Sequence, residues 1–273
     1  MLFGITALPT SAPNLSVRSP PTTVVRYFDI PHRDFYNNVM KEGTGKRGNS
    51  KQDITLLAAY KSPEQITVTI MSNGRYGNTV FCRYFDNAQN ELHPPFKTVV
   101  FPEYSVFCVQ RDAATFISLS DNSSGIYTYP VPITDRTKDV PEYFFSVCLA
   151  PLYGNEPKWL LLSEFIEHYK LQGAVHFYVY IRRIDEYSAI VLNDYVRTGD
   201  VEVVFLHDNY QKTDVDWQHI EIQAHGFNTT RRIKDCLTRA KGHSQWVAFV
   251  DLDERLTPTY YSGTLVEFLK LVI

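Results

Sequence analysis

Two aspartates close to the end of the chain are the residues best suited to chemistry. Asp251 and Asp253 directly follow five apolar residues, Trp246–Val250. If strand geometry continues past Val250, alternation of side chains would point both carboxylates to the same side. Paired carboxylate oxygens suit a Mg²⁺ or Mn²⁺ ion that keeps positions open for substrate phosphates. The alternative is a pair of solvated carboxylates in a turn.

Two enzyme classes place an acid-x-acid motif after a buried strand. In aspartate-nucleophile phosphatases of the haloacid dehalogenase type, the first aspartate attacks phosphate and the second acts as general acid. That class has Thr or Val two residues beyond the second aspartate, where this chain has Arg255. It also opens its sheet with this strand, whereas three predicted strands precede it here. In nucleotide-sugar transferases the strand comes fourth and the pair holds a metal on the diphosphate, so the order favours a transferase.

The elements that position these aspartates alternate between strand and helix. Apolar runs predict strands at Tyr143–Ala150, Val175–Ile181, Val201–Leu206 and Gln245–Val250, and helical spacing predicts helices at Lys158–Leu171, Glu186–Thr198 and, interrupted near Gly226, Trp217–Ala240. This alternation is typical of an α/β fold with a mostly parallel sheet and crossover helices. Ligands bind at the carboxyl ends of such strands, in the loops at 151–157, 182–185, 207–216 and 251–256.

The first half of the chain has a different pattern. Residues 1–22 are rich in Ser, Pro and Thr and predict a disordered tail or linker. Residues 23–132 predict an antiparallel β-rich region with strands at Ile54–Tyr60, Gln65–Met71, Thr79–Phe85, Lys97–Phe101, Ser105–Gln110 and Thr115–Leu119. A linker at 133–141 then leads into a nucleotide-sugar-binding part at 142–273.

Several separated motifs in this second part resemble glycosyltransferase family 92. They are Phe145–Glu156, the helix with Trp159, Glu164, Phe165, His168 and Tyr169, the pieces Gln223, Asp235-Cys236-Leu237 and Arg239, and Phe249–Glu254. The family has the GT-A fold and is abundant in nematodes. The resemblance implies transfer of a hexose, as in a galactosyltransferase, from a UDP-sugar to a glycan hydroxyl with inversion. Mn²⁺, or Mg²⁺ in its place, is the implied cofactor.

The same resemblance implies roles for particular residues. Asp253 would bind the metal, and Asp251 would contact the metal or the ribose. The residues implied to line the nucleotide site are Pro151, Leu152, Tyr153, Glu156 and Asp235. A catalytically inactive module that binds nucleotide-sugar or glycan remains the alternative.

The catalytic base is not among the residues that the resemblance identifies. In inverting enzymes of this fold it lies downstream of the metal motif, and Glu267 is the only carboxylate after Arg255. The apolar pattern around Glu267 predicts a helix with this side chain on its solvated face. We therefore expect the base beyond Ile273 and the domain to be truncated at its C-terminal side.

Composition narrows the partners and the compartment. The 273 residues carry 30 acidic and 27 basic side chains, for a net charge of −3, so no basic excess favours a nucleic-acid partner. No apolar run reaches the roughly 18 residues that a membrane helix needs. The family resemblance implies the lumenal side of a Golgi or secretory-pathway membrane, with a membrane anchor that this chain does not show. N-glycosylation patterns at Asn14, Asn122 and Asn228 agree with that route.

The four cysteines have no close pair spacing typical of a metal or redox site. Cys82 and Cys108 fall in neighbouring predicted strands, and a disulfide and two free thiols both fit them. Cys148 and Cys236 fit equally well as small buried apolar residues.

Three further patterns are weaker. Gly43–Gly48 matches a dinucleotide-binding glycine motif, but no buried strand precedes it and no helix follows. Arg182 and Arg183 could approach a diphosphate, although a solvated strand end is the simpler interpretation. The histidines His207, His219, His225 and His243 lack the HxxxH spacing and are interpreted as surface or hydrogen-bonded residues rather than metal ligands.

Overall fold

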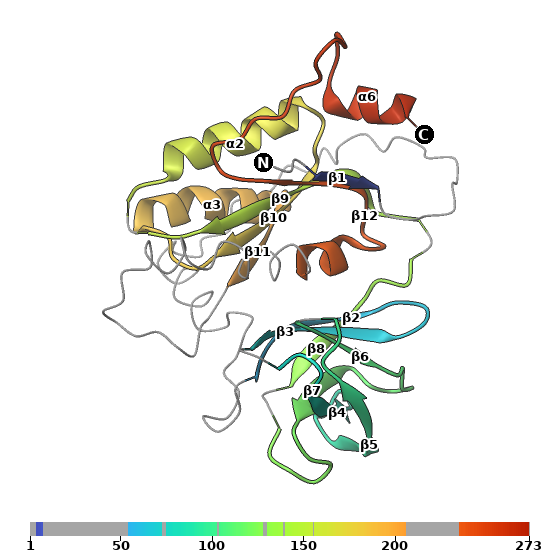
Figure 1. The fold of residues 1–273 in the computed structure, drawn as a ribbon. Helices are drawn as coiled ribbons and strands as arrows, with labels where there is room; N and C mark the ends of the chain where they lie inside the picture. Colours follow the sequence, from blue (N-terminus) through green and yellow to red (C-terminus); the bar gives the residue numbers. More distant parts are fainter. Residues whose placement is uncertain are drawn as a thin grey trace. The chain divides into compact units, whose positions relative to one another are not determined.

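A computed structural model describes residues 4–7, 54–72, 75–102, 104–127, 130–138, 140–154, 156–205 and 235–272. The chain divides into two compact units. The α/β unit comprises Met1–Glu42, Asp139–Val204 and Gly242–Ile273, and the β unit comprises Gly43–Lys138 and Phe205–Lys241. Each has its own sheet (Figure 1). The chain is therefore a mixed α/β protein whose larger sheet is mostly antiparallel.

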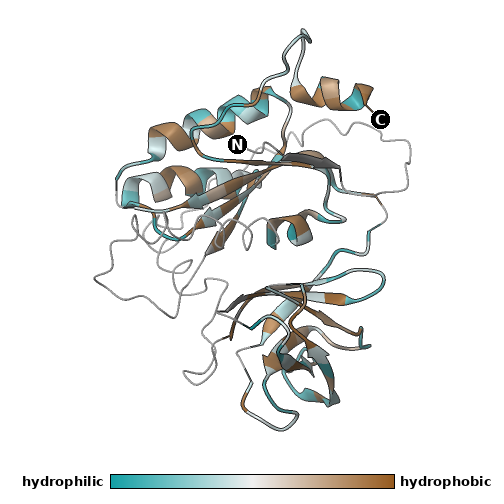
Figure 2. Cartoon of the chain, viewed as in Figure 1, coloured by the Kyte–Doolittle hydropathy of each residue, from teal (hydrophilic) through white to brown (hydrophobic). Residues whose placement is uncertain are grey.

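The sheet of the α/β unit has the strand order β1-β12-β9-β10-β11. Its strands are β1 (Gly4–Ala7), β9 (Tyr143–Leu152), β10 (His176–Ile181), β11 (Val201–Phe205) and β12 (Ser244–Val250). The central strand β9 pairs in parallel with both β10 and β12. This parallel core agrees with the sequence pattern, since β9, β10 and β12 are buried along most of their length. Figure 2 shows the sheet of this unit largely in the brown of hydrophobic residues.

The prediction of a structureless tail at 1–22 is wrong at Gly4–Ala7. This segment forms β1, which pairs antiparallel with β12 in the register Gly4 to Phe249. Four residues are too few to show a periodic pattern, and their hydrogen-bonding partner lies more than two hundred residues away in the sequence. Only the folded chain brings the two segments together.

The helices of this unit are α2 (Trp159–Leu171), α3 (Glu186–Thr198) and α6 (Leu265–Leu271). α2 and α3 pack against each other, with the Trp159 and Tyr187 rings 5.5 Å apart in an edge-on contact. α3 begins after Asp185 and ends at Gly199, whose φ of +83° favours glycine. Both ends agree with the sequence prediction. No helix among the described residues is long and apolar enough to cross a bilayer.

The sheet of the β unit has the strand order β5-β4-β7-β8-β2-β3-β6. Its strands are β2 (Ile54–Lys61), β3 (Ile66–Ser72), β4 (Thr79–Phe85), β5 (Glu91–Val99), β6 (Ser105–Cys108), β7 (Phe116–Ser120) and β8 (Val131–Asp135). Neighbours pair antiparallel except β2 with β8, which pair in parallel. A continuous apolar core lies within this unit.

Two predictions for the β unit are corrected. β5 covers Glu91–Val99 rather than Lys97–Phe101; Pro94 and Pro95 concealed it, and the strand tolerates them because it lies at the sheet edge. β8 begins before the predicted linker at 133–141 and occupies its first residues. A strand of five residues with one proline has too little pattern to be recognised without its neighbours.

All four cysteines are disulfide-bonded. Cys82 on β4 and Cys108 on β6 form one bridge, with their Cα atoms 6.1 Å apart. Of the two alternatives for these cysteines, a disulfide or two free thiols, the structure has the disulfide. Cys148 and Cys236 are buried, as predicted, but they are disulfide-bonded rather than simply small apolar residues. Disulfides are typical of proteins that fold in an oxidising compartment.

Candidate functional site

The strand order of the α/β unit locates its candidate ligand site. Four of its strands lie side by side in the order β11, β10, β9, β12. When they are numbered along the chain from β9, this order is third, second, first, fourth. This is the order of a mononucleotide-binding half-sheet, in which ligands bind outside the carboxyl ends where the winding direction reverses. The reversal lies between β9 and β12, whose register pairs Val250 with Leu149. The loops after these two strands, at 153–157 and 251–256, therefore share one edge.

Asp251 and Asp253 lie in a tight turn at this edge. β12 ends at Val250, and the Glu254 amide donates to the Asp251 carbonyl at 3.1 Å. The Glu254 side chain accepts from the Asp251 amide at 2.9 Å. Strand alternation therefore does not extend to these residues, and that argument for their common direction is wrong. Both aspartates are exposed, so their carboxylates are accessible to a hydrated cation and a phosphate.

Helix α2 anchors the segment that follows the aspartates. The buried Tyr169 hydroxyl donates to the Glu254 carbonyl at 3.2 Å and accepts from the Leu256 amide at 3.1 Å. The Leu256 carbonyl lies 3.0 Å from Nε2 of His168. Burial raises the pKa of Tyr169, so the phenol stays protonated as this hydrogen-bond pattern requires.

The Arg255 side chain also stabilises the turn, through hydrogen bonds to its backbone. Its guanidinium donates to the Leu252 carbonyl at 2.7 Å and to the Glu254 carbonyl at 2.9 Å. The same group lies 5.4 Å from the ring centre of Phe165 on α2. The sequence identified Phe165, His168 and Tyr169 only as a helical motif. Their role in positioning the aspartate turn depends on how α2 packs against the sheet.

We predict that Tyr169→Phe loosens this turn. The variant leaves the Glu254 carbonyl and the Leu256 amide without the hydroxyl, at a cost of about 1 kcal/mol per hydrogen bond. Metal and nucleotide affinity at the turn should fall roughly tenfold by calorimetry, with little change in far-UV circular dichroism. Tyr195→Phe is a matched control, because its hydroxyl donates to the surface residue Glu167 at 2.9 Å. Equal losses in both variants would contradict a positioning role for Tyr169.

The segment after β9 forms the other side of the edge. Pro151 and Leu152 are the last two residues of β9 and are buried, so the strand runs two residues further than predicted. Tyr153 is 43% exposed. Gly154 has a φ of +81°, and a Cβ there would lie 2.3 Å from the Glu156 carboxylate. That carboxylate is paired with Nζ of Lys158 at 2.7 Å, which fixes the shape of the loop.

Asp185 ties the starts of α2 and α3 together. Its carboxylate accepts from the Ser188 amide at 2.9 Å and from the Lys158 amide at 3.3 Å. Partial burial raises the pKa of Asp185, but the bonds from Ser188 and Lys158 outweigh it and leave the pKa below its usual range. Arg182 and Arg183 precede it, and both their amides donate to the Leu152 carbonyl.

We predict that Asp185→Ala destabilises the α/β unit by about 1 kcal/mol, the usual cost of losing a helix N-cap. Asp185→Asn keeps the cap but removes the charge. The extra stability of aspartate over asparagine should be complete above the ordinary carboxyl pKa near 3.9 and disappear as the pH falls through the lowered native pKa. Urea unfolding between neutral and acid pH measures both effects. Asp194→Ala, at an exposed position on α3, is the control and should be nearly neutral.

The remaining candidate residues belong to other elements of the two units. Asp235 belongs to the β unit and is 1% exposed; its carboxylate accepts from Thr69 at 2.5 Å and pairs with Arg239 at 3.3 Å. Glu267 is exposed on α6, as predicted, and forms a reciprocal cap with Thr264. Asn122 is exposed in a turn of the β unit.

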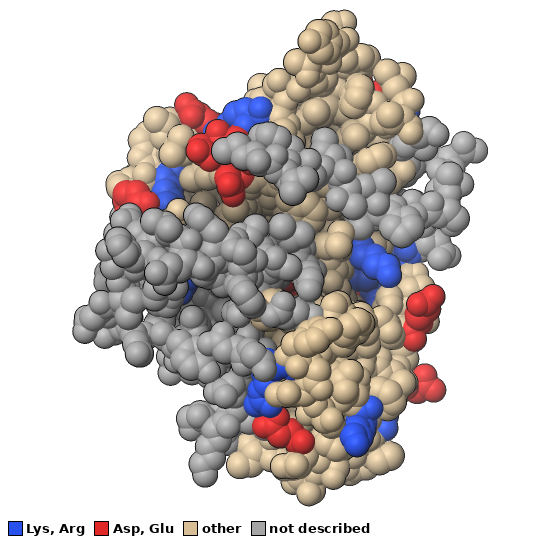
Figure 3. Space-filling view, in the orientation of Figure 1, with Lys and Arg blue, Asp and Glu red and all other residues tan. Residues whose placement is uncertain are grey.

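Several predictions fall outside the described residues. They are the glycosylation patterns at Asn14 and Asn228, the glycine motif at 43–48, the loop at 207–216, most of the predicted helix at 217–240, and His207, His219 and His225. Charges on the described part are mixed: on the face drawn in Figure 3, acidic and basic side chains are interspersed and neither sign forms a large continuous patch.

The α/β unit thus combines the strand order of a half-sheet with an acidic turn at the carboxyl ends of its strands. Residues 143–272 match the family model of glycosyltransferase family 92. The resemblance is thereby confirmed for residues 143–272, which are just under half of the chain.

Curated relatives agree with this assignment. A Caenorhabditis elegans protein named beta-1,4-galactosyltransferase galt-1 is 30% identical over 133 residues, which are 48% of this chain and 29% of that protein. A glycosyltransferase family 92 protein of the same organism is 29% identical over 134 residues, 45% of this chain and 24% of that protein. The match thus spans less than a third of the length of either relative.

The solved structures that align with this chain resemble it only weakly. The β-glucuronidase of Ruminococcus gnavus bound to D-glucaro 1,5-lactone aligns with 81% of this chain and 40% of its own, at 16% identity and a TM-score of 0.28. The apo form of the same enzyme aligns with a TM-score of 0.28 and 15% identity, again covering 81% of this chain and 40% of that chain. Likeness at this level carries no argument about function.

Proposed function

We propose that the α/β unit is the donor-binding part of a GT-A-like glycosyltransferase that transfers a hexose from a UDP-sugar to a glycan hydroxyl. The observation that carries the proposal is the pair of exposed carboxylates, Asp251 and Asp253, in a turn at the reversal point of the sheet. The match of residues 143–272 to the family model supports the reaction class. Galactose is the proposed sugar because of the name of the relative galt-1.

Asp251 and Asp253 are the proposed metal-binding residues. Their oxygen donors fit a hard divalent cation, and their exposure leaves room for water and diphosphate oxygens in its other positions. Mn²⁺, or Mg²⁺ in its place, would supply positive charge against the negative charge that develops on departing UDP. The protein's own contribution is to hold the two carboxylates in place through Tyr169, Arg255 and the Glu254 side chain.

The segment after β9 is the proposed wall of the nucleotide pocket. Tyr153 offers an exposed ring on which a uracil base could stack. Glu156, held by Lys158, and the last β9 residues Pro151 and Leu152 shape the backbone beside it. Asp235 enters the proposal only through the family resemblance.

Inversion requires a carboxylate base at the acceptor hydroxyl. Glu267 is not assigned this role, since its side chain accepts from the Thr264 amide at 2.8 Å and caps α6. The acceptor is proposed to be a glycan or glycoprotein in the lumen of the Golgi or another secretory compartment. The disulfides and the exposed glycosylation pattern at Asn122 support that location.

Calorimetry with UDP in the presence and absence of Mn²⁺ tests the donor site on the 273-residue chain. Metal-dependent binding of UDP is expected, and its absence would contradict the proposal. Release of UDP from UDP-galactose in the presence of a glycan acceptor then separates an active transferase from a binding module that keeps donor affinity without turnover. The phosphatase alternative is dropped, because the parallel strands β9 and β10 and the strand β11 precede β12 along the chain, whereas that class opens its sheet with this strand, and because the family match is to a transferase.

A further inference from the structure

A second polar cluster lies at the opposite edge of the α/β sheet from the aspartate turn. It consists of His176, the first residue of β10, Glu202 on β11, and His243 immediately before β12. These are at or near the amino ends of their strands, whereas Asp251 follows the carboxyl end of β12. At about 3.3 Å per residue, the seven residues of β12 separate His243 from Asp251 by roughly 25 Å. The cluster is therefore distinct from the donor site.

We propose that His176, Glu202 and His243 bind a divalent transition metal, with Zn²⁺ the best match. One ligand atom from each residue lies within 4.8 Å of the other two. Two donors on a tetrahedral zinc lie about 3.4 Å apart, from bond lengths of about 2.1 Å. Nε2 of His176 is already 3.7 Å from a Glu202 oxygen, so side-chain movements of about 1 Å bring the ligand atoms to bonding distance.

The state of His176 is the second observation that points to a ligand. The residue is 5% exposed, and neither ring nitrogen has a hydrogen-bond partner among the described residues. Tyr143 stacks on its ring at 4.3 Å, and Tyr178 contacts it edge-on at 4.8 Å. Buried polar atoms are usually paired. The His176 ring is packed between two tyrosines and lies beside the Glu202 carboxylate and the His243 ring. This is an arrangement typical of a metal-binding histidine.

The hydrogen bonds around His243 are compatible with the tautomer that a metal needs. Nδ1 of His243 lies 2.7 Å from the Tyr178 hydroxyl, which lies 3.0 Å from the Ser244 hydroxyl; Ser244 in turn lies 2.7 Å from the Ser146 hydroxyl. When Nδ1–H donates to Tyr178 and Tyr178 donates to Ser244, Nε2 of His243 keeps its lone pair. Metal-bound histidines usually donate their second ring N–H in this way. Sequence spacing gave no signal, because the three ligands come from three separate segments.

The fourth position has a protein candidate. An oxygen of Glu142, which precedes β9, lies 3.8 Å from Nε2 of His243, and Glu142 is 46% exposed. Glu142 or a water molecule would complete four-coordination. The ion would then join the amino ends of β9, β10, β11 and β12, which suits a structural role. Two imidazoles and carboxylate oxygen match Zn²⁺, whereas the oxygen-only pair Asp251 and Asp253 matches Mn²⁺ or Mg²⁺.

Zinc binding by the whole chain tests the proposal. The protein is stripped with a chelator, reloaded with Zn²⁺ and passed through a desalting column. The background carries Asp251→Asn and Asp253→Asn, so that the acidic turn cannot account for retained metal. We expect one zinc per chain by elemental analysis and a rise in Tm on adding Zn²⁺. No retained zinc in this background would overturn the proposal.

Two variants then assign the ligands. Glu202→Gln changes a half-buried side chain with little change in size and should weaken zinc affinity by more than the roughly 10- to 100-fold that loss of an outer hydrogen-bond partner costs. His176→Gln should do the same, whereas His93→Gln, at a histidine whose side chain is 67% exposed in the β unit, should leave affinity unchanged. Unchanged affinity in Glu202→Gln and His176→Gln would also overturn the assignment.

Cobalt provides a readout that does not require the Glu202 and His176 variants to fold. Co²⁺ added to the chain with the aspartates replaced should give the visible absorption of a tetrahedral nitrogen and oxygen site, and Zn²⁺ should abolish it by competition. An octahedral spectrum, or none, would contradict the proposed site. Binding of UDP and Mn²⁺ is measured separately, so failure of the zinc site leaves the proposed donor site unaffected.

Discussion

Replacing Asp253 with alanine should weaken Mn²⁺-dependent binding of UDP by roughly three orders of magnitude. A unit charge about 4 Å from the metal contributes on the order of 4 kcal/mol at an effective dielectric near 20, and each 1.4 kcal/mol is about tenfold in affinity. Asp253 is exposed in a turn, so the change removes a ligand without opening a cavity. Calorimetry at fixed Mn²⁺ concentration measures the loss.

Two controls separate the metal site from general effects of charge. Asp253→Asn keeps the shape of the side chain and one oxygen but removes the negative charge. Most of the loss of Mn²⁺-dependent UDP affinity expected for Asp253→Ala should therefore also occur in Asp253→Asn. Asp194→Asn, an exposed carboxylate on α3 in the same unit, should bind as the unchanged chain does. Metal-dependent UDP binding that persists in Asp253→Asn and Asp253→Ala would rule out the assignment of the turn as the donor site.

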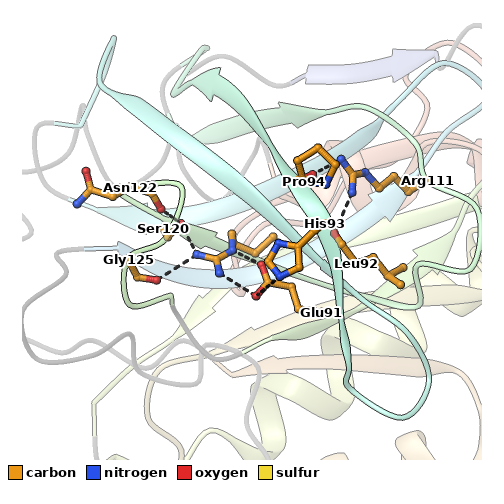
Figure 4. Close-up of polar contacts among 9 residues, drawn as sticks. Glu91, Leu92, His93, Pro94, Arg111, Ser120, Asn122 and Gly125 are labelled. Atoms are coloured by element: carbon orange, nitrogen blue, oxygen red, sulfur yellow. Dashed lines mark hydrogen bonds and ion pairs between the residues drawn. The ribbon is translucent and has the colours of Figure 1, made fainter.

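Replacing Glu91 with leucine should destabilise the β unit by about 3 kcal/mol, at the lower end of the range for breaking a buried ion pair. The Arg83 guanidinium donates to both Glu91 oxygens, to the Gly125 carbonyl at 3.0 Å and to the Ser120 hydroxyl at 3.3 Å. Figure 4 labels these three partners, Glu91, Gly125 and Ser120. The Arg83 side chain is 5% exposed and that of Glu91 is 17% exposed. The other two hydrogen-bond partners of the guanidinium in the described part of the chain, Ser120 and the Gly125 carbonyl, are uncharged, so loss of Glu91 leaves a buried charge without its counter-ion there.

A double-mutant cycle tests this account by urea unfolding. Arg83→Met together with Glu91→Leu should cost less than Glu91→Leu alone, because the double variant leaves no buried charge. Arg75→Met, which breaks the more exposed pair with Asp121, should cost less than about 1 kcal/mol. A double variant as unstable as the sum of its single changes would contradict the explanation.

The same pair predicts a pH dependence. The hydrogen bond from Arg83 holds the pKa of Glu91 below its usual range. Because the native pKa is lowered, this contribution to stability is complete above the ordinary glutamate pKa near 4.3 and disappears as the pH falls through the native value. The difference in unfolding free energy between the unchanged chain and Glu91→Leu should narrow over that interval.

The sequence by itself determined the elements with long regular patterns and the chemistry that follows them. Apolar runs predicted β9, β10 and β12, and helical spacing predicted α3 over Glu186–Thr198, the range that the structure has. The position of Asp251 and Asp253 directly after a buried strand also followed from local pattern. Each of these depends on residues close together in the chain, where periodicity and capping are visible.

Only the tertiary structure decided what depends on distant partners. β1 pairs with β12 across the whole sequence, Tyr169 and Arg255 hold the aspartate turn through the packing of α2, and the disulfide of Cys82 with Cys108 was one of two alternatives. His176, Glu202 and His243 gather because parallel strands bring their amino ends to one edge. Ligands from separate strands leave no spacing signal, since the distance between them is set by strand order and register rather than by position along the chain.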